Sequence, residues 1–276
     1  MNTTLLKDKV LIVSGASRGI GKAIALRMAK AGMRVVILGK TENPHPKVPG
    51  TIHETVADIE KEGGQALAVA CDVRDTEQLA SAVEKTLKTF GQLDMVVNNA
   101  GAIQLQTLDQ LESKRIDLMT QINAYAPIHL IKFALPYLKN SEHAHILNIC
   151  PPIDLDLKWF AKHSIYTVSK YSQSMLTLGL SEEFKKDAIA VNGLWPKTLV
   201  ATAAVQNLLG GDQMIQRSRK TDIVADAAHW IFCQSPEKTT GNLFLDENVL
   251  SKAGISNLDQ YAINPDMGLQ NDLYVS

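Results

Sequence analysis

The fold is decided by the stretch Val10-Leu11-Ile12-Val13-Ser14-Gly15-Ala16-Ser17-Arg18-Gly19-Ile20-Gly21, near the start of this 276-residue chain. Its first four residues are apolar, which is typical of a strand buried on both faces. A glycine-bearing turn follows, and residues 20–31 have a helical pattern that ends at Gly32. Such a turn lets backbone amides approach a phosphate at the helix N-terminus, so the stretch predicts a dinucleotide-binding unit. The alternative, a glycine turn that binds nothing, is disfavoured by the flanking strand and helix.

Outward from this unit, short β-branched runs alternate with longer segments of helical period. This alternation predicts an α/β fold, a doubly wound parallel sheet of about seven strands with helices on both faces. The expected strands are residues 10–13, 35–38, 66–70, 95–97, 145–149, 189–194 and 242–245. The expected helices are residues 20–31, 52–62, 77–89 and 166–184. Three prolines in residues 41–50 predict an extended loop, because each disfavours helix at the residue before it.

The composition excludes several classes of protein. The formal net charge of −1 lacks the basic excess that nucleic-acid binding favours, and no apolar run reaches the about 18 residues of a membrane span. The cysteines Cys71, Cys150 and Cys233 are far apart, and His143-x-His145 has no further partners, so no disulfide framework or metal site is expected. We therefore expect a cytoplasmic, single-domain protein over residues 1–276, with residues 247–276 as a C-terminal extension. The polar tail of this extension after Leu250 is expected to cover either the site or a subunit contact.

Five motifs follow one another in order: Gly15 to Gly21, Asp72, Asn98-Asn99-Ala100-Gly101, Asn123 and Tyr166-x-x-x-Lys170. Together they resemble the short-chain dehydrogenase/reductase family, from about residue 9 to residue 246. The resemblance implies a Rossmann fold and an oxidoreductase that uses a nicotinamide cofactor. Residues 40–47, 150–152, 195–198 and 246–248 point to one subgroup of this family. Members of that subgroup can carry a sterol-carrier domain at the C-terminus, for which we expect no room in 276 residues.

Tyr166 and Lys170 lie one turn apart on the expected helix and share a face. An ammonium near a phenol favours the phenolate and lowers the pKa of the phenol from about 10 toward the range of an acid/base catalyst. The spacing alone would more often belong to a solvated helix surface. The resemblance implies that Tyr166 is the catalytic acid/base, that Lys170 also binds the nicotinamide ribose, and that Asn123 holds a water in the proton relay. From the residues alone, Asn123 is explained equally well as a buried polar group of a helix.

The end of the second expected strand predicts the cofactor. NAD sites place a carboxylate there for the ribose hydroxyls, whereas this chain has Gly39 followed by Lys40. Gly39 leaves room for a 2′-phosphate, and Lys40 and Arg18 supply positive charge, so we predict NADP(H). Two solvated basic residues are the alternative.

The resemblance places Asp72 at the adenine edge and Asn99 along the adenosine ribose. The full predicted cofactor set is Gly15, Ser17, Arg18, Gly19, Ile20, Gly21, Lys40, Asp72, Val73, Asn99, Ala100, Gly101, Tyr166, Lys170 and Pro196.

The chain departs from the family at Cys150-Pro151, where members usually carry two serines and the second donates a hydrogen bond to the substrate oxygen. Proline has no donor and a thiol is a poor one. We expect residues 153–164 to supply a substitute through Ser164 or His163. Three neighbours on that segment should then shape the substrate mouth, namely Lys158, Trp159 and Phe160.

Two functions follow. The first is NADP(H)-dependent interconversion of a carbonyl and a secondary alcohol, with Tyr166 as acid/base. An apolar small-molecule substrate is suggested by Trp195, Leu199, Val200, Val205, Leu208 and Leu209, where the family places a lid, although a helix packing stripe explains them equally well. The second is a nucleotide-binding sensor or scaffold that lost efficient catalysis with the serine. By analogy with the family we expect a homo-oligomer, either a dimer or a tetramer.

Overall fold

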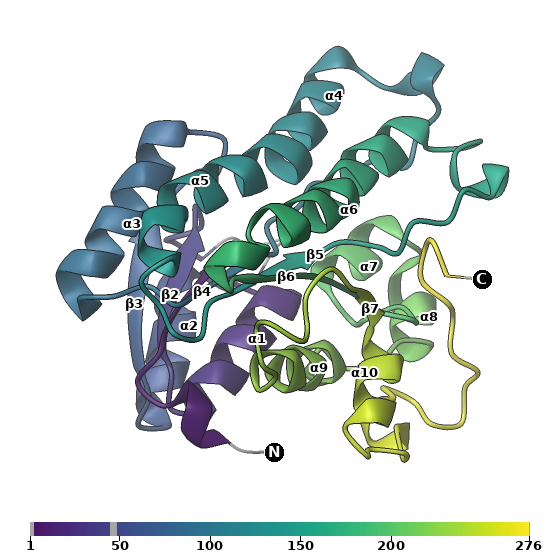
Figure 1. The fold of residues 1–276 in the computed structure, drawn as a ribbon. Coiled ribbons are helices and arrows are strands. Elements are labelled where there is room, and N and C mark those ends of the chain that lie inside the picture. The colour runs from purple at the N-terminus through teal and green to yellow at the C-terminus, as the bar shows by residue number, and fades with distance from the viewer. Residues whose placement is uncertain (1–2, 45–48, 276) are drawn as a thin grey trace.

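The centre of the computed structural model, which describes residues 3–44 and 49–275, is one sheet of seven parallel strands (Figure 1). Its order is β3-β2-β1-β4-β5-β6-β7. The strands are β1 (Val10–Ser14), β2 (Arg34–Gly39), β3 (Gln65–Ala70), β4 (Met95–Asn98), β5 (His145–Ile149), β6 (Ala190–Trp195) and β7 (Leu243–Leu245). The predicted doubly wound parallel sheet is confirmed, and each expected strand lies within one residue of an observed strand.

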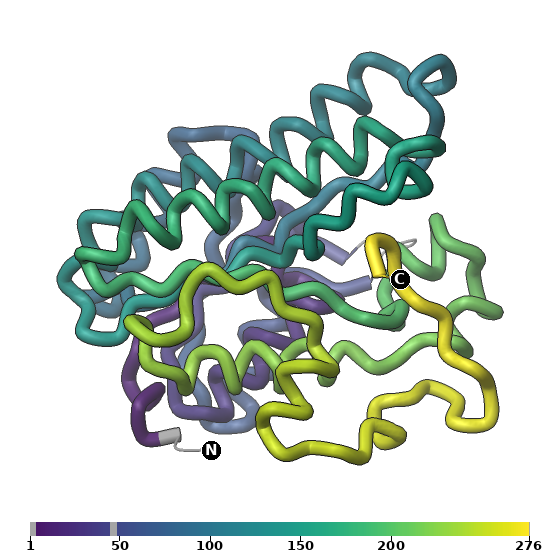
Figure 2. The backbone as a smooth tube through the Cα atoms, turned by 45° about the vertical axis from the view of Figure 1, so that its right-hand side comes forward, coloured from purple at the N-terminus to yellow at the C-terminus, as the bar shows by residue number. Residues whose placement is uncertain are grey.

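Helices cover both faces of the sheet (Figures 1 and 2). One face carries α3 (Thr76–Phe90), α5 (Ala126–Leu138) and α6 (Ser164–Glu183), and the other carries α1 (Gly19–Lys30), α2 (Ile52–Lys61) and α9 (Asp222–Phe232). Side chains of successive β1 residues point alternately toward the two helical layers. Leu11 and Val13 pack in one core, Val10 and Ile12 in the other, and all four are fully buried. An uninterrupted apolar run is what a strand between two helical layers requires.

The remaining helical elements have bounds that the sequence analysis did not assign. They are α4 (Ser113–Met119), the π-helical turn η3 (Thr120–Tyr125), α7 (Ala203–Leu208), α8 (Gly211–Gln216) and α10 (Asp246–Lys252), with 3-10 turns at Thr3–Leu6, Leu108–Gln110, Leu157–Trp159, Lys185–Asp187 and Asp259–Tyr261. α4 runs through η3 into α5 with helical dihedrals at Met119 and Tyr125. The wide turn shifts the apolar period, so the segment has no single helical pattern in sequence.

Of the predicted loop at residues 41–50, residues 41–44 and 49–50 form neither helix nor strand, and residues 45–48 lie outside the described residues. Across the described ranges, none of the helices combines the length and apolar character that a membrane span needs.

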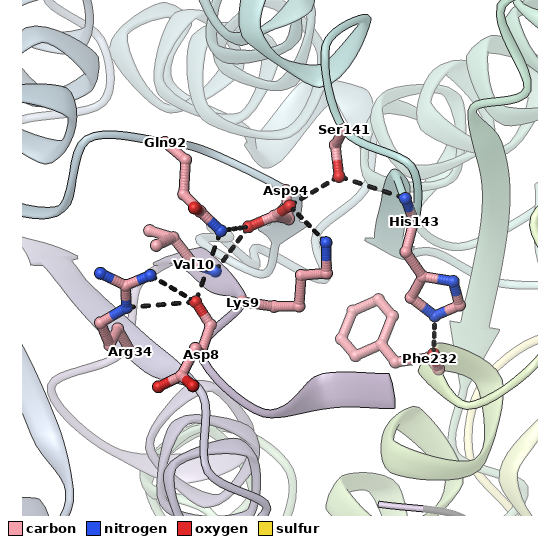
Figure 3. Close-up of polar contacts among 9 residues, drawn as sticks. All are labelled: Asp8, Lys9, Val10, Arg34, Gln92, Asp94, Ser141, His143 and Phe232. Atoms are coloured by element: carbon pink, nitrogen blue, oxygen red, sulfur yellow. Dashed lines mark hydrogen bonds and ion pairs between the residues drawn. The ribbon is translucent and has the colours of Figure 1, made fainter. Parts of the chain in front are cut away.

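Asp94 connects three strands at the amino edge of the sheet (Figure 3). Its carboxylate accepts hydrogen bonds from the Val10 amide at 2.8 Å, Gln92 Nε2 at 2.7 Å and Ser141 Oγ at 2.6 Å. The Lys9 ammonium lies 3.3 Å away, and the His145 amide donates to the Asp94 carbonyl. The side chain is only 3% exposed. One carboxylate therefore holds the starts of β1, β4 and β5 together, far from the edge at which ligands bind in such folds.

The C-terminal segment after α10, yellow in Figure 2, returns to the opposite edge of the sheet. Asn271 forms an antiparallel bridge with Thr198, just beyond β6. The Leu199 amide donates to the Gln270 carbonyl at 2.8 Å, and the Asp272 amide donates to the Lys197 carbonyl at 3.0 Å. The segment is thus hydrogen-bonded alongside the loop that leaves β6.

Candidate active site

Two adjoining cavities lie at the carboxyl ends of the strands, where the strand order reverses between β1 and β4. The larger has a volume of about 600 Å³ and the smaller about 200 Å³. Their common wall consists of Ile20, Asn99, Gly101, Thr202 and Ala204. A ligand longer than one cavity can therefore extend from the first into the second.

The turn after β1 forms the floor of the large cavity. Gly15 has φ +66°, and a Cβ there would lie 2.8 Å from Ala100 Cα. A Cβ on Gly21 would lie 2.4 Å from Asn99 Nδ2, so this glycine allows α1 to pack against the turn. α1 begins without a side-chain cap and without an acidic residue in its first turn. Its first amides are left for an anion, which fits the pyrophosphate of a dinucleotide.

Most predicted cofactor residues line these cavities. The large cavity contains Gly15, Ser17, Arg18, Gly19, Ile20, Lys40, Asp72, Val73, Asn99, Ala100 and Gly101. The small cavity contains Asn123, Tyr166, Lys170 and Pro196. Gly21 lines neither, because it packs behind the turn. Sequence reasoning missed Thr202, Ala203, Ala204 and Asn207 in the large cavity, since neither charge nor pattern marks them.

Three charged residues line the far end of the large cavity. Arg18 donates through Nε and Nη2 to the carbonyls of Pro49 and Gly50, both at 2.8 Å, and burial lowers its pKa. The Asp72 carboxylate is clamped by Arg74, whose hydrogen bonds lower the pKa of Asp72 to about 2. Lys40 is exposed at the cavity wall. Two donors of Arg18 are thus engaged by backbone carbonyls, and Lys40 is the more accessible cation.

Tyr166 and Lys170 extend from α6 into the small cavity, and each is only 6% exposed. Lys170 Nζ donates to the Ile149 carbonyl at 2.6 Å and to Gln173 Oε1 at 3.1 Å. Burial lowers the pKa of Lys170 to about 8. Burial also raises the pKa of Tyr166 well above 10, helped by the nearby Tyr274 and Asp272.

The predicted direction of the Tyr166 pKa is therefore wrong. The sequence argument assumed that the Lys170 ammonium faces the phenol in a solvated setting. In the structure the ammonium is held by the Ile149 carbonyl, and the loss of water around the phenol outweighs any attraction from it.

Asn123 lies in the wide turn η3 and is 1% exposed. Its Oδ1 accepts from the Ala102 amide, and its Nδ2 donates to the Ala102 carbonyl, both at 2.8 Å. Nδ2 also donates to Ser169 Oγ at 3.0 Å. The side chain thus fastens the strand-end loop to α6, which fits the buried-polar interpretation. The water-holding role stays a prediction.

Comparison with known proteins settles the family. The model of the short chain dehydrogenase family matches residues 9–211. The chain belongs to this family. It is 50% identical over 274 residues to human hydroxysteroid dehydrogenase-like protein 2, which confirms the subgroup indicated by the sequence. The match covers 99% of this chain and 65% of that protein, so the chain spans about 65% of the length of the curated relative.

Solved structures agree with this assignment. A Mycobacterium thermoresistibile short chain dehydrogenase is 43% identical, with a TM-score of 0.93 over 98% of this chain and 96% of its own. A Xanthomonas campestris protein is 42% identical, with a TM-score of 0.95 over 98% of this chain and 99% of its own. Two structures that share only the fold, at 24% and 22% identity, are complexes with NADP and NAD respectively. Fold likeness alone therefore does not choose between the two cofactors.

In this short-chain dehydrogenase, the residues at the family's serine positions are absent from the lining of the small cavity. Cys150 is fully buried, and its Sγ lies 3.6 Å from Thr177 Oγ1 on the core side of α6. Neither Cys150 nor Pro151 lines the cavity. The chain's departure from the family pattern thus removes the donor without putting the thiol in its place.

Residues 153–164 do not line the small cavity either. The prediction that Trp159 and Phe160 shape the mouth rather than pack is wrong, because both pack against the core. Trp159 Nε1 donates to the Asp154 carboxylate, and Phe160 meets the Tyr171 ring edge-on. The His163 ring centroid lies 6.4 Å from that of Tyr166. The substitution by Ser164 or His163 stays a prediction for the cofactor-bound enzyme.

The C-terminal extension forms one wall of the small cavity. Asp272 and Leu273 line it, and the Leu273 carbonyl accepts from Trp195 Nε1 at 2.9 Å. The Tyr274 ring stacks on that of Tyr166, with centroids 6.3 Å apart. Of the two roles left open for this extension, the structure shows the one at the site. No periodic or motif signal in residues 270–275 indicates it.

Proposed function

We propose that this short-chain dehydrogenase interconverts a carbonyl and a secondary alcohol with NADP(H). The proposal is carried by one observation, the opening of the glycine-walled cavity into a smaller one that contains Tyr166 and Lys170. Residues of the large cavity would hold the nucleotide, and Lys170 would hold its nicotinamide ribose. When bound, the cofactor supplies or accepts the hydride.

The chain's own residues supply the proton and the dry surroundings. With its raised pKa, Tyr166 is protonated at neutral pH, and this is the form that gives a proton to a carbonyl oxygen. The small cavity is walled by Trp195, Val200, Val205 and Leu209. An apolar wall excludes water and favours an apolar substrate of small size.

NADP(H) is proposed over NAD(H) from the cavity end near β2. Gly39 and Lys40 line it where an NAD site would carry a carboxylate. Lys40 is exposed and forms no hydrogen bond or ion pair within residues 3–44 and 49–275, although its charge helps to lower the pKa of Asp72. Its ammonium is therefore available to a 2′-phosphate.

The test is turnover of an aldehyde and ketone panel with NADPH, followed by loss of reduced-nicotinamide absorbance. We expect Tyr166→Phe to lower kcat by about 10²–10⁴, because it removes the acid, while NADPH binding stays within a few-fold. Tyr171→Phe is the matched control, since Tyr171 lies on the same helix and lines neither cavity. Undiminished turnover by Tyr166→Phe would refute the role of the phenol.

A second candidate is a nucleotide-binding sensor or scaffold with weak catalysis. It is favoured by the absence of Cys150 and Pro151 from the cavity wall. This candidate predicts micromolar NADPH binding with no turnover across the panel. A gain of turnover in Pro151→Ser would instead identify a slow enzyme that lacks a donor.

We further propose a homo-oligomer, because α5, α6 and the preceding turn expose large apolar side chains. They are Tyr125, Ile128, Val168, Met175 and Leu178. We propose one domain over residues 1–276, with residues 247–276 as its extension. The free thiols of Cys71, Cys150 and Cys233 are compatible with the proposed cytoplasmic location.

A further inference from the structure

Carbonyl reduction needs a second hydrogen-bond donor beside the phenol, and most polar groups of the small cavity are already engaged. The Asn123 amide is bonded to Ala102 and Ser169. Lys170 Nζ is bonded to Ile149 and Gln173. Cys150 points into the core. The Asp272 carboxyl is the remaining polar side chain that α6 and the extension contribute to this cavity.

Asp272 is held firmly in this place. Its amide donates to the Lys197 carbonyl at 3.0 Å, and Trp195 Nε1 binds the next carbonyl at 2.9 Å. Tyr274 anchors the following turn, because its hydroxyl lies 3.1 Å from Thr167 Oγ1 and its ring contacts those of Tyr166 and Tyr171. The carboxyl is therefore fixed relative to α6, as a group that orients a substrate must be.

One oxygen of this carboxyl is available. Oδ1 accepts from the Leu273 amide at 2.7 Å, whereas Oδ2 has no hydrogen-bond partner within residues 3–44 and 49–275. Asp272 is half-buried and lines the small cavity, so Oδ2 is accessible to a ligand or water there. As a neutral acid the carboxyl can donate a hydrogen bond to either.

The surroundings favour the neutral acid. Burial is the main reason that the pKa of Asp272 is raised to about 7, and the negative charge of Asp246 raises it further. The hydrogen bond from the Leu273 amide and the positive charge of Lys170 lower it. The other titratable groups that interact with it are Tyr166 and Tyr274. Of these four groups, Asp246 lies on α10 and Tyr274 on the extension, whereas Lys170 and Tyr166 lie on α6.

We propose that Asp272 takes the place of the family's absent serine, with its protonated carboxyl donating a hydrogen bond to the substrate oxygen while Tyr166 transfers the proton. This role rests on the proposed carbonyl reduction. Asp272 keeps its own proton throughout. The carbonyl carbon gains hydride from reduced nicotinamide, and its oxygen gains the proton of Tyr166. A neutral carboxyl in an apolar cavity is a strong donor to a developing oxyanion.

The experiment compares Asp272→Ala and Asp272→Asn with the wild type in NADPH-dependent reduction of the panel's best substrate. Asp272→Ala should lower kcat by about 10²–10³, as for loss of one oxyanion donor, with NADPH affinity unchanged. Asp272→Asn keeps a donor at every pH, so it should retain kcat within about 10-fold. Wild-type kcat should fall as pH rises through about 7, and Asp272→Asn should lack that fall.

The matched control is Asp266→Ala, because Asp266 is an exposed aspartate of the same extension. If Asp272→Ala reduces substrate as fast as this control, the donor role is overturned while the proposed function stands. If the wild type turns over no carbonyl at all, the proposed function fails, and the role of Asp272 fails with it.

Thermal unfolding gives a readout that is independent of turnover. Folded Asp272 binds its proton more tightly than unfolded aspartate, so this group costs the wild type stability as pH rises from about 4 to about 7. The Tm advantage of Asp272→Asn over the wild type should grow across that window and then level off. A constant Tm difference from pH 4 to pH 8 would exclude a buried neutral acid and overturn the proposal.

Discussion

The two side chains that define the small cavity are both driven toward their neutral forms. Burial disfavours the charged state of any group, so the pKa of Lys170 falls to about 8 while that of Tyr166 rises. With a pKa of about 8 the lysine still retains its proton at neutral pH, and its ammonium donates to the Ile149 carbonyl and to Gln173. A neutral phenol fits the proposed donation of a proton better than the storage of a phenolate.

Lys40 carries the prediction on cofactor choice. We expect NADPH to bind more tightly than NADH, and Lys40→Asp to invert the order, because a lost charged contact costs about 1–3 kcal/mol and a new carboxylate repels the 2′-phosphate. Titration of both nucleotides by fluorescence or calorimetry measures this. Lys61→Asp makes the same charge change on an exposed residue outside both cavities. Equal affinities of the wild type for the two nucleotides would contradict the charge argument.

The sequence could predict the site residues that belong to short, recognisable motifs. Most of the glycine turn, together with Asp72, Asn99, Tyr166 and Lys170, lines the two cavities. Their pKa values could not be predicted, because they depend on burial by segments distant in sequence. Asp272 could not be found at all, since a lone aspartate in a nonperiodic extension has no local signal.

At the scale of elements, the strands were predictable because their information is short-range. Each β-strand contains a short run of apolar residues between turns, which a sequence shows directly. The helices from residue 113 to residue 138 were not predictable in the same way, because the π-turn at Thr120–Tyr125 breaks their period. The short helices α7 and α8 have six residues each, too few to show a pattern.

Asp94 carries the prediction on how the strands are held together. We expect Asp94→Ala to lower the free energy of unfolding by about 1–3 kcal/mol, because it leaves the buried Val10 amide without an acceptor. Urea unfolding measures this, with an unchanged slope indicating a change of stability alone. Glu142→Ala is the control, since Glu142 is exposed at the same edge of the sheet. Equal midpoints for the two variants would show that Asp94 does not stabilise the strand ends.

At the scale of the whole molecule, the two helical layers differ in what they expose. α1, α2 and α9 interlock with one another and with the extension through a continuous apolar core. On the other layer, Val168 is 60% and Met175 is 59% exposed on α6. Apolar side chains gathered on one face of a molecule are typical of a contact between subunits.

We expect the wild type to be a dimer or tetramer by size-exclusion chromatography with light scattering. The double variant Val168→Glu with Met175→Glu should shift it to a smaller species, because two buried charges would oppose the contact. Leu108→Glu is the control, since Leu108 is equally exposed, at 62%, in the 3-10 turn before α4. A monomeric wild type would refute the interface.

The residues that line the two cavities are completed at different times during protein synthesis. Every described residue that lines the large cavity precedes residue 209, whereas the small cavity needs Asp272 and Leu273. Chains emerge from the ribosome N-terminus first, and domains generally fold as units. All residues of the large cavity are therefore synthesised well before Asp272 and Leu273. The small cavity, where we propose that the substrate binds, is complete only when the C-terminal segment has been added.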